Sequence, residues 1–186
     1  MRTNLRITEI LAFPEALLTL TLQIGKTQII GAGVLMLGMA VTVGTALGFQ
    51  HIGGYIPCKL CLEQRLPYYI GVPVAALTLL AAIMKLPPAI VRVLLITLAL
   101  LMMWSLWLGG FHSGVEWGFW PGPDDCGVVA SSQAGGGSLL DQLDAVIPPS
   151  CDQAAGRFLC LSFAGWNVVA SAILAAIAWV AALGKN

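Results

Sequence analysis

Two cysteines, Cys58 and Cys61, are separated by two residues and directly follow Pro57. A thiol is nucleophilic as its thiolate, and a CxxC pair at a helix start favours that anion because free backbone N–H groups and the helix dipole face it. Arg65 comes four residues after Cys61, so on a helix the two side chains share a face. A permanent positive charge would then lie beside the Cys61 sulfur. This spacing predicts a redox-active pair.

Other roles for the CxxC pair are less well supported by the sequence. A structural disulfide closing so short a loop gives little entropic stabilisation. A zinc site needs more ligands, and the chain has only His51 and His112 and no second CxxC. Haem attachment needs a histidine after the second cysteine, but Leu62 stands there. A metal-binding or transport membrane protein with Cys58 and Cys61 as soft ligands is the alternative from another functional class.

A second pair, Cys126 and Cys151, lies in a long polar stretch with proline and glycine nearby. A disulfide between them would close a 25-residue separation, worth roughly 3–4 kcal/mol in the chain-entropy treatment. We expect its sulfur atoms to be accessible to an attacking thiol, because bridges in poorly packed loops exchange more readily. Cys160 makes the count odd. We expect it to be a buried free thiol at the foot of the last helix, with Cys126–Cys160 as the less favoured pairing.

The elements that hold these cysteines are predicted to be membrane helices. Of the 186 residues, 58% are apolar and 10% charged, against about 25% charged in a soluble domain. A spanning helix needs about 20 mostly apolar residues. Four windows without charge approach this length: Ile29 to Phe49, Tyr68 to Met84, Val93 to Phe111 and Ala164 to Leu183. We predict an all-α four-helix membrane bundle over 29–186, with a first loop at about 50–66 and a second at about 112–163.

The sequence also makes predictions for three segments outside the four windows. The second window is short, and a helix that begins near Cys58 and bends at Pro67 or Pro73 would lengthen it. Residues 1–28 are predicted to form an interfacial segment rather than a cleaved signal peptide. A short amphipathic helix is predicted at Leu139–Ile147 in the second loop.

Charge predicts the orientation of the bundle. With four spans, one side would hold six of the nine basic residues and the other side three. The positive-inside rule then places both termini in the cytoplasm and both cysteine loops outside. Tyrosine and tryptophan side chains near the outer helix ends would form an interfacial belt, namely Tyr68, Tyr69, Trp104, Trp107 and Trp166. The sequence has no stripe of basic residues of the kind that would indicate nucleic-acid binding.

Three polar residues near the outer helix ends have less specific signals. Asn167 is predicted to form hydrogen bonds between helices, with contact to a cofactor as the alternative. His112 and Glu116 are expected near the first loop. The sequence leaves two roles open for them, a position on the surface or the handling of protons in the reaction.

From residue 29 onward the chain resembles the disulfide bond formation protein B (DsbB) family. The resemblance rests on the run Pro57 to Arg65, on four spans with both termini inside, and on one cysteine near each end of the second loop. It implies a quinone-dependent thiol oxidase of the bacterial inner membrane, with ubiquinone or menaquinone as acceptor. A periplasmic thioredoxin-fold protein similar to DsbA would be its dithiol partner.

The resemblance also implies a role for each site residue. Cys61 would face the quinone beside Arg65, and Cys58 would exchange with the loop pair. Cys126 would be attacked by the partner, and Cys151 would resolve the mixed disulfide. A vitamin K epoxide reductase-like protein is the alternative within the enzyme class, although there the CxxC follows the loop pair.

Overall fold

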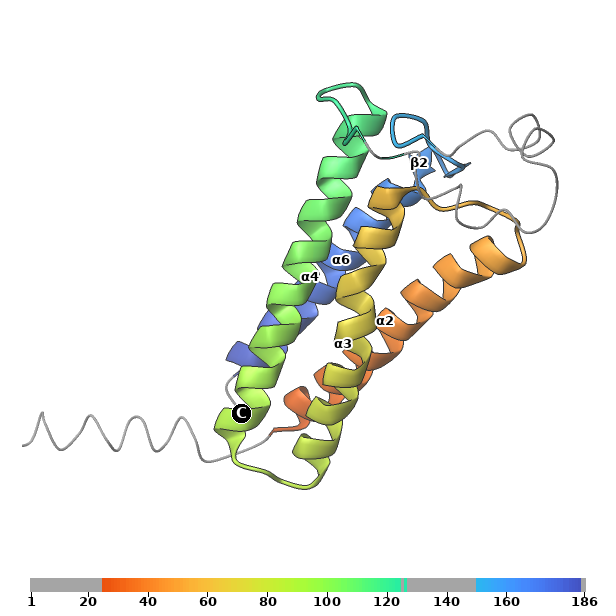
Figure 1. The fold of residues 1–186 in the computed structure, drawn as a ribbon. Coiled ribbons are helices and arrows are strands. Elements are labelled where there is room, and N and C mark those ends of the chain that lie inside the picture. Colours follow the sequence, from red (N-terminus) through yellow and green to blue (C-terminus); the bar gives the residue numbers. More distant parts are fainter. Residues whose placement is uncertain (1–24, 125, 127–149, 185–186) are drawn as a thin grey trace, which may run out of the picture.

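The computed structural model describes residues 25–124, 126 and 150–184. Within them, four helices are each long and apolar enough to cross a membrane, which confirms the predicted four-span fold. The elements are α2 (Lys26–His51), α3 (Lys59–Ile83), α4 (Pro88–Glu116), β1 (Arg157–Phe158), β2 (Leu161–Ser162) and α6 (Phe163–Leu183). In Figure 1 the start of α3, the end of α4 and the β strands meet at one end of the bundle, and α2 diverges from α3 toward that end. The predicted helix at Leu139–Ile147 and nearly all of segment 1–28 lie outside the described residues.

Helix α3 begins next to the first cysteine. Cys58 is its N-cap residue, and the backbone N–H of Cys61 donates to the Cys58 sulfur. Pro67 and Pro73 both lie inside the helix, which membrane helices tolerate because neighbouring groups compensate for the lost hydrogen bonds. The prediction that this helix begins near Cys58 is therefore confirmed. The first loop ends at Cys58 and not near residue 66.

Helix α4 extends beyond its predicted window at both ends. Pro88 is at its first position, where the missing N–H costs nothing. Arg92 and the segment from His112 to Glu116 are also helical, because polar residues end an apolar window without ending a helix. The second loop thus begins after Glu116 rather than at residue 112. This extension places His112 and Glu116 one turn apart on a regular helix.

The core of the bundle is built from apolar side chains and close helix contacts. Leu35, Met39 and Leu95 are fully buried. At Gly31 an added Cβ would lie 2.6 Å from the Cβ of Ala181, so a small residue allows α2 to approach α6. Large apolar side chains elsewhere point outward, as lipid contact requires.

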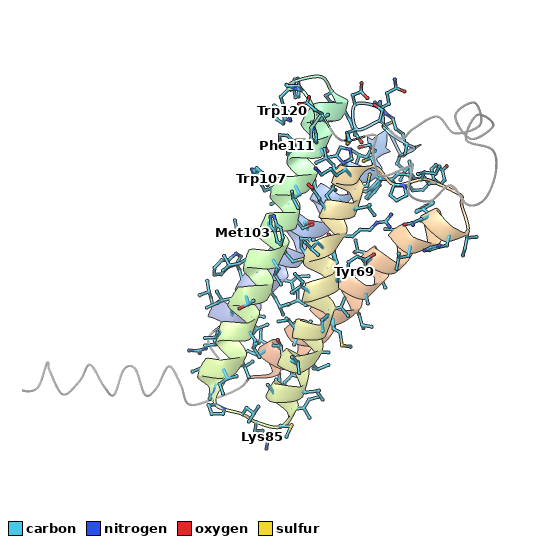
Figure 2. All side chains as sticks on the ribbon, viewed as in Figure 1. Tyr69, Lys85, Met103, Trp107, Phe111 and Trp120 are labelled. Atoms are coloured by element: carbon cyan, nitrogen blue, oxygen red, sulfur yellow. A yellow bond between two sulfur atoms is a disulfide. The ribbon has the colours of Figure 1, made fainter. Side chains whose placement is uncertain are left out.

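Aromatic rings line the outward face of α4 toward its C-terminal end. Trp107 and Phe111 of α4 are followed by Trp120 from the turn after the helix, and both successive ring centroid distances are 5.9 Å (Figure 2). Trp107 agrees with the predicted interfacial belt, being exposed. Tyr68 does not, because it is buried and its hydroxyl is hydrogen-bonded inside the bundle.

Cys160 lies in a tight turn between β1 and β2, where Arg157 pairs with Ser162. Leu159 and Cys160 have φ values of 51° and 67°, the left-handed conformation that two-residue hairpin turns require. Such a turn directs its central side chains away from the bundle, and Cys160 is an exposed free thiol. The prediction of a buried thiol at a helix foot is wrong.

Candidate functional site

The second cysteine pair is a disulfide. Cys126 and Cys151 are bonded, with their Cα atoms 5.9 Å apart, which confirms the favoured pairing. Both residues are buried in a cluster with Cys58, Leu60 and Val115. The expectation of accessible sulfur atoms is wrong for this state, because the bridge packs against the start of α3 and the end of α4.

The four sulfur atoms form one continuous group. The Sγ atoms of Cys58, Cys126 and Cys151 all lie within 4.8 Å of one another. Cys58 and Cys61 are free thiols with their sulfur atoms 3.0 Å apart. Thiol–disulfide exchange requires a thiolate to reach a disulfide sulfur, so this proximity is what sequential exchange needs.

The surroundings of Cys58 favour its thiolate. The pKa of Cys58 is lowered from 9.0 to about 5, and the hydrogen bond with the Cys61 side chain is the largest cause. Burial opposes this change, while His112 adds to it, with its Nε2 atom 3.8 Å from the sulfur. The Cys61 N–H, 3.3 Å away, contributes as well. Together these contacts favour the thiolate form of Cys58 at neutral pH.

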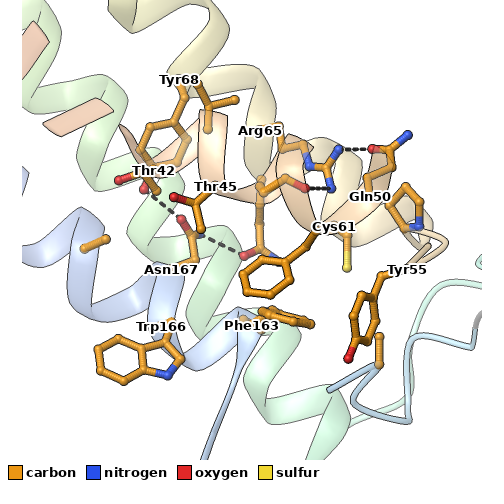
Figure 3. Close-up of a pocket in the computed structure, with 18 of the residues that line it drawn as sticks. Thr42, Thr45, Gln50, Tyr55, Cys61, Arg65, Tyr68, Phe163, Trp166 and Asn167 are labelled. Carbon is orange, nitrogen blue, oxygen red and sulfur yellow. Dashed lines mark hydrogen bonds between the residues drawn. The ribbon is translucent and has the colours of Figure 1, made fainter. Parts of the chain in front are cut away.

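A cavity of about 500 Å³ opens beside Cys61, between α2, α3 and α6. This is the size of pockets that hold small organic ligands. Apolar and aromatic side chains form most of its wall, and Figure 3 shows Tyr55, Cys61 and Arg65 toward one end with Tyr68 and Asn167 toward the other. Cys61 is thus the cysteine that meets this cavity, and Cys58 is not part of its wall.

Arg65 is held in the cavity wall by the end of α2. Its guanidinium donates to the Gln50 side chain and to the backbone carbonyl of Ala46, the latter at 3.4 Å. The predicted shared face of Cys61 and Arg65 is present, since both side chains line the same cavity (Figure 3). A fixed cation therefore lies where a polar ligand atom could accept its hydrogen bonds.

A second cavity, of about 280 Å³, adjoins the first beside the CxxC pair. Cys58, Cys61, His112 and Glu116 line it together with residues from the segment before β1. Cys61 touches both cavities, whereas Cys58 touches only this one. Cys61 therefore lies where the two cavities adjoin, and Cys58 faces only the smaller one.

A buried polar network joins α3, α4 and α6 below the cysteines. Asn167 donates to Gln64 Oε1 at 2.8 Å and accepts from the Tyr68 hydroxyl at 2.7 Å. Tyr68 also contacts Ser171, which donates to Ser105 at 2.9 Å. The network confirms Asn167 as a bond between helices, and Asn167 also lines the larger cavity.

The family model of disulfide bond formation protein DsbB matches residues 30–181, most of the chain. The chain belongs to the DsbB family. It is accordingly a multi-pass membrane oxidoreductase for disulfide-bond formation, and the vitamin K epoxide reductase-like alternative is set aside. Comparison with curated proteins and with solved structures found no match.

Several residues of this DsbB-family site were not identified from the sequence. Gln50 accepts from Arg65. The polar network includes four more such residues, Gln64, Tyr68, Ser105 and Ser171. The available signal was a polar residue inside an apolar helix, which is costly in lipid and therefore points to a specific partner. The expectation that His112 and Glu116 lie near the first loop is confirmed, because both line the smaller cavity with Cys58.

Proposed function

We propose that this protein oxidises the dithiol of a DsbA-like thioredoxin-fold protein in the periplasm and transfers the electrons to a membrane quinone, ubiquinone or menaquinone. One observation carries the proposal. The sulfur atoms of the loop disulfide lie within 4.8 Å of the Cys58 sulfur, which is 3.0 Å from that of Cys61, and Cys61 meets a cavity large enough for a quinone ring. The loop pair is a disulfide while the CxxC pair is reduced, which is the state such a relay reaches once electrons have passed from the loop pair to the CxxC pair.

In the first exchange, a partner thiolate attacks Cys126 and forms a mixed disulfide while Cys151 leaves as a thiolate. The second partner thiol, and not Cys151 as the resemblance implied, then releases the mixed disulfide, because attack by Cys151 would only restore the loop disulfide and the reduced partner. The partner is thereby oxidised by two electrons, and the loop pair is reduced. Because Cys126 and Cys151 are buried, the partner must first displace the packing around Val115 and Leu60. Burial thus protects the bridge from unspecific thiols.

In the second exchange, the Cys151 thiolate attacks Cys58 of an oxidised CxxC pair, and Cys61 leaves. Cys126 then attacks Cys151, restoring the loop disulfide and releasing Cys58. Cys58 is a good leaving group because its pKa is lowered to about 5. Two electrons and two protons have moved from the loop pair to the CxxC pair.

The larger cavity fits a quinone. Its apolar walls suit a ring and an isoprenoid tail, and Arg65 supplies a fixed guanidinium for a ring oxygen. When bound, a quinone supplies the acceptor for two electrons and two protons. Cys61, which lines the same cavity as Arg65, is the residue whose thiol would be oxidised there.

The compartment follows from charge. Three of the nine basic residues lie in the predicted outer segments, against six on the other side. The positive-inside rule supports cytoplasmic termini in a bacterial inner membrane, with the cysteine end in the oxidising periplasm.

Cys61→Ser tests the proposal. In detergent-purified protein supplied with a reduced thioredoxin-fold partner and a soluble ubiquinone, the variant should lose quinone reduction, measured by loss of quinone absorbance. Cys160→Ser is the control and should retain it, because Cys160 lies in the hairpin turn away from the sulfur group. Normal turnover by Cys61→Ser would refute the assignment.

One observation favours metal binding as a second function. Cys58, Cys61 and His112 each offer a ligand atom, all within 4.8 Å of one another, although His112 is far away in sequence. Structural zinc takes four protein ligands, and the neighbouring sulfur atoms of Cys126 and Cys151 are bonded to each other. Elemental analysis of the purified protein distinguishes the functions: stoichiometric metal supports this one, and redox cycling without metal supports the relay.

A further inference from the structure

The side-chain network of α3, α4 and α6 determines where His112 carries its proton. The argument begins at the backbone carbonyl of Ser105, which can only accept hydrogen bonds. The Asn167 side-chain atom 3.3 Å from this oxygen must therefore be the amide nitrogen, Nδ2. The orientation of the Asn167 amide is thereby fixed, and its Oδ1 accepts from the Tyr68 hydroxyl at 2.7 Å.

The Asn167 orientation fixes that of Gln64. The same Nδ2 group also lies 2.8 Å from the Gln64 side chain, so the Gln64 atom facing it must be the acceptor Oε1. The Gln64 Nε2 group then points at Nδ1 of His112, 2.6 Å away. Because Nε2 of Gln64 can only donate, Nδ1 of His112 must accept and cannot carry a proton.

In its neutral form His112 therefore carries the proton on Nε2. That N–H faces the Cys58 sulfur at 3.8 Å and the Glu116 carboxylate at 3.8 Å. An N–H group on Nδ1 would instead meet the N–H group of Gln64, so that two donors would face each other. The other group facing Cys58 is the Cys61 thiol, with the Cys126–Cys151 bridge packed beside it.

We propose that Gln64 is a positioning residue that holds His112 as the neutral Nε2–H tautomer, so that His112 directs a hydrogen-bond donor at the Cys58 sulfur. This inference rests on the proposed role of Cys58 in thiol exchange for its functional meaning. A donor at this position stabilises the thiolate when Cys58 attacks and when it leaves. The tautomer itself can be measured without quinone or partner.

The first test is ¹⁵N NMR of the full chain in detergent micelles, with labelled histidine. The chain has two histidines, and His51→Gln leaves only the His112 signals. The expected spectrum at neutral pH shows a protonated Nε2 and an unprotonated Nδ1. A protonated Nδ1, whether in the other tautomer or in the imidazolium, would overturn the proposal.

Gln64→Glu provides the matched perturbation. It replaces the donor facing Nδ1 with a carboxylate oxygen, and the second oxygen can still accept from Asn167. The expected result is that Nδ1 of His112 becomes protonated. An unprotonated Nδ1 in a folded Gln64→Glu variant would mean that Gln64 does not control the tautomer.

The effect on Cys58 is measured as the rate of alkylation against pH. In a Cys61→Ser, Cys160→Ser background Cys58 is the only free thiol, because Cys126 and Cys151 are bonded. Removing the donor with His112→Phe should reduce the alkylation rate at a pH below the thiol's pKa about tenfold and shift the profile one unit upward, as expected for the loss of one hydrogen bond to a charged group. An unshifted profile would contradict the proposal. Its failure is distinct from that of the relay, which the Cys61→Ser turnover assay decides.

Discussion

Replacing Asn167 with leucine should destabilise the bundle by about 2 kcal/mol, because this amide joins three helices. Leucine is similar in size, so the change removes hydrogen bonds and not packing volume. The three main lost partners are Gln64 Oε1 at 2.8 Å, the Tyr68 hydroxyl at 2.7 Å and Ser105, whose hydroxyl and carbonyl oxygens lie 3.2 and 3.3 Å from the amide nitrogen. Hydrogen bonds between membrane helices average roughly 0.6 kcal/mol each, and three sum to about 2 kcal/mol. Tyr68 keeps Ser171 as a partner, which limits the loss.

The assay is equilibrium unfolding in mixed micelles with increasing SDS, followed by circular dichroism. Thr45→Val is the control, because the Thr45 hydroxyl is exposed and bonds only to Val41 of its own helix. The control should change the free energy of unfolding by less than about 0.5 kcal/mol. If Asn167→Leu is no more destabilising than Thr45→Val, the network does not hold the helices together and the reasoning fails.

Four further outcomes follow from the site and its packing. Arg65→Met should raise KM for a soluble quinone roughly 10- to 100-fold, as expected for the loss of a hydrogen bond from a charged group, and an unchanged KM would remove Arg65 from the binding site. The alkylation rate of Cys58 should stay constant from neutral pH down and then fall as pH drops through about 5; a midpoint near 9 would contradict the stabilised thiolate. The folded-state pKa of Cys58 is about 5, below the ordinary 9.0, so the stability contributed by its thiolate is complete only above about pH 9 and is lost as pH falls through about 5. Comparing the free energies of unfolding of Cys58→Ser and the native chain across this pH range measures that loss. Gly31→Ala should cost about 1–3 kcal/mol in the SDS assay because its Cβ would meet Ala181 at 2.6 Å, whereas Gly33→Ala, with open space around it, should cost little.

The sequence predicted the fold well because a membrane span is a local property. Length, apolar content and basic residues suffice to find four helices, and the structure has all four. The errors fall at helix ends. Windows of uncharged residues stopped at Tyr68 and Phe111, while the helices begin at Lys59 and end at Glu116, since a polar side chain at the membrane surface leaves the backbone hydrogen bonds intact.

The cysteine predictions separate local from tertiary information. The pairing of Cys126 with Cys151 followed from their position in a polar loop. Their burial did not, because it depends on packing against Leu60 and Val115 from two different helices. Cys160 was misplaced since a two-residue hairpin leaves little periodic signal in an otherwise helical chain.

By itself the sequence determined the spans, because a span needs only a continuous run of about 20 mostly apolar residues. It also determined the CxxC at a helix start and the shared face of Cys61 and Arg65, because these depend on residues about one helical turn apart. Only the tertiary structure brought His112 to the Cys58 sulfur across 54 positions, and Gln64 to Asn167 across 103. Such contacts depend on how each helix is rotated and shifted against its neighbours, which close packing of side chains from every helix decides together.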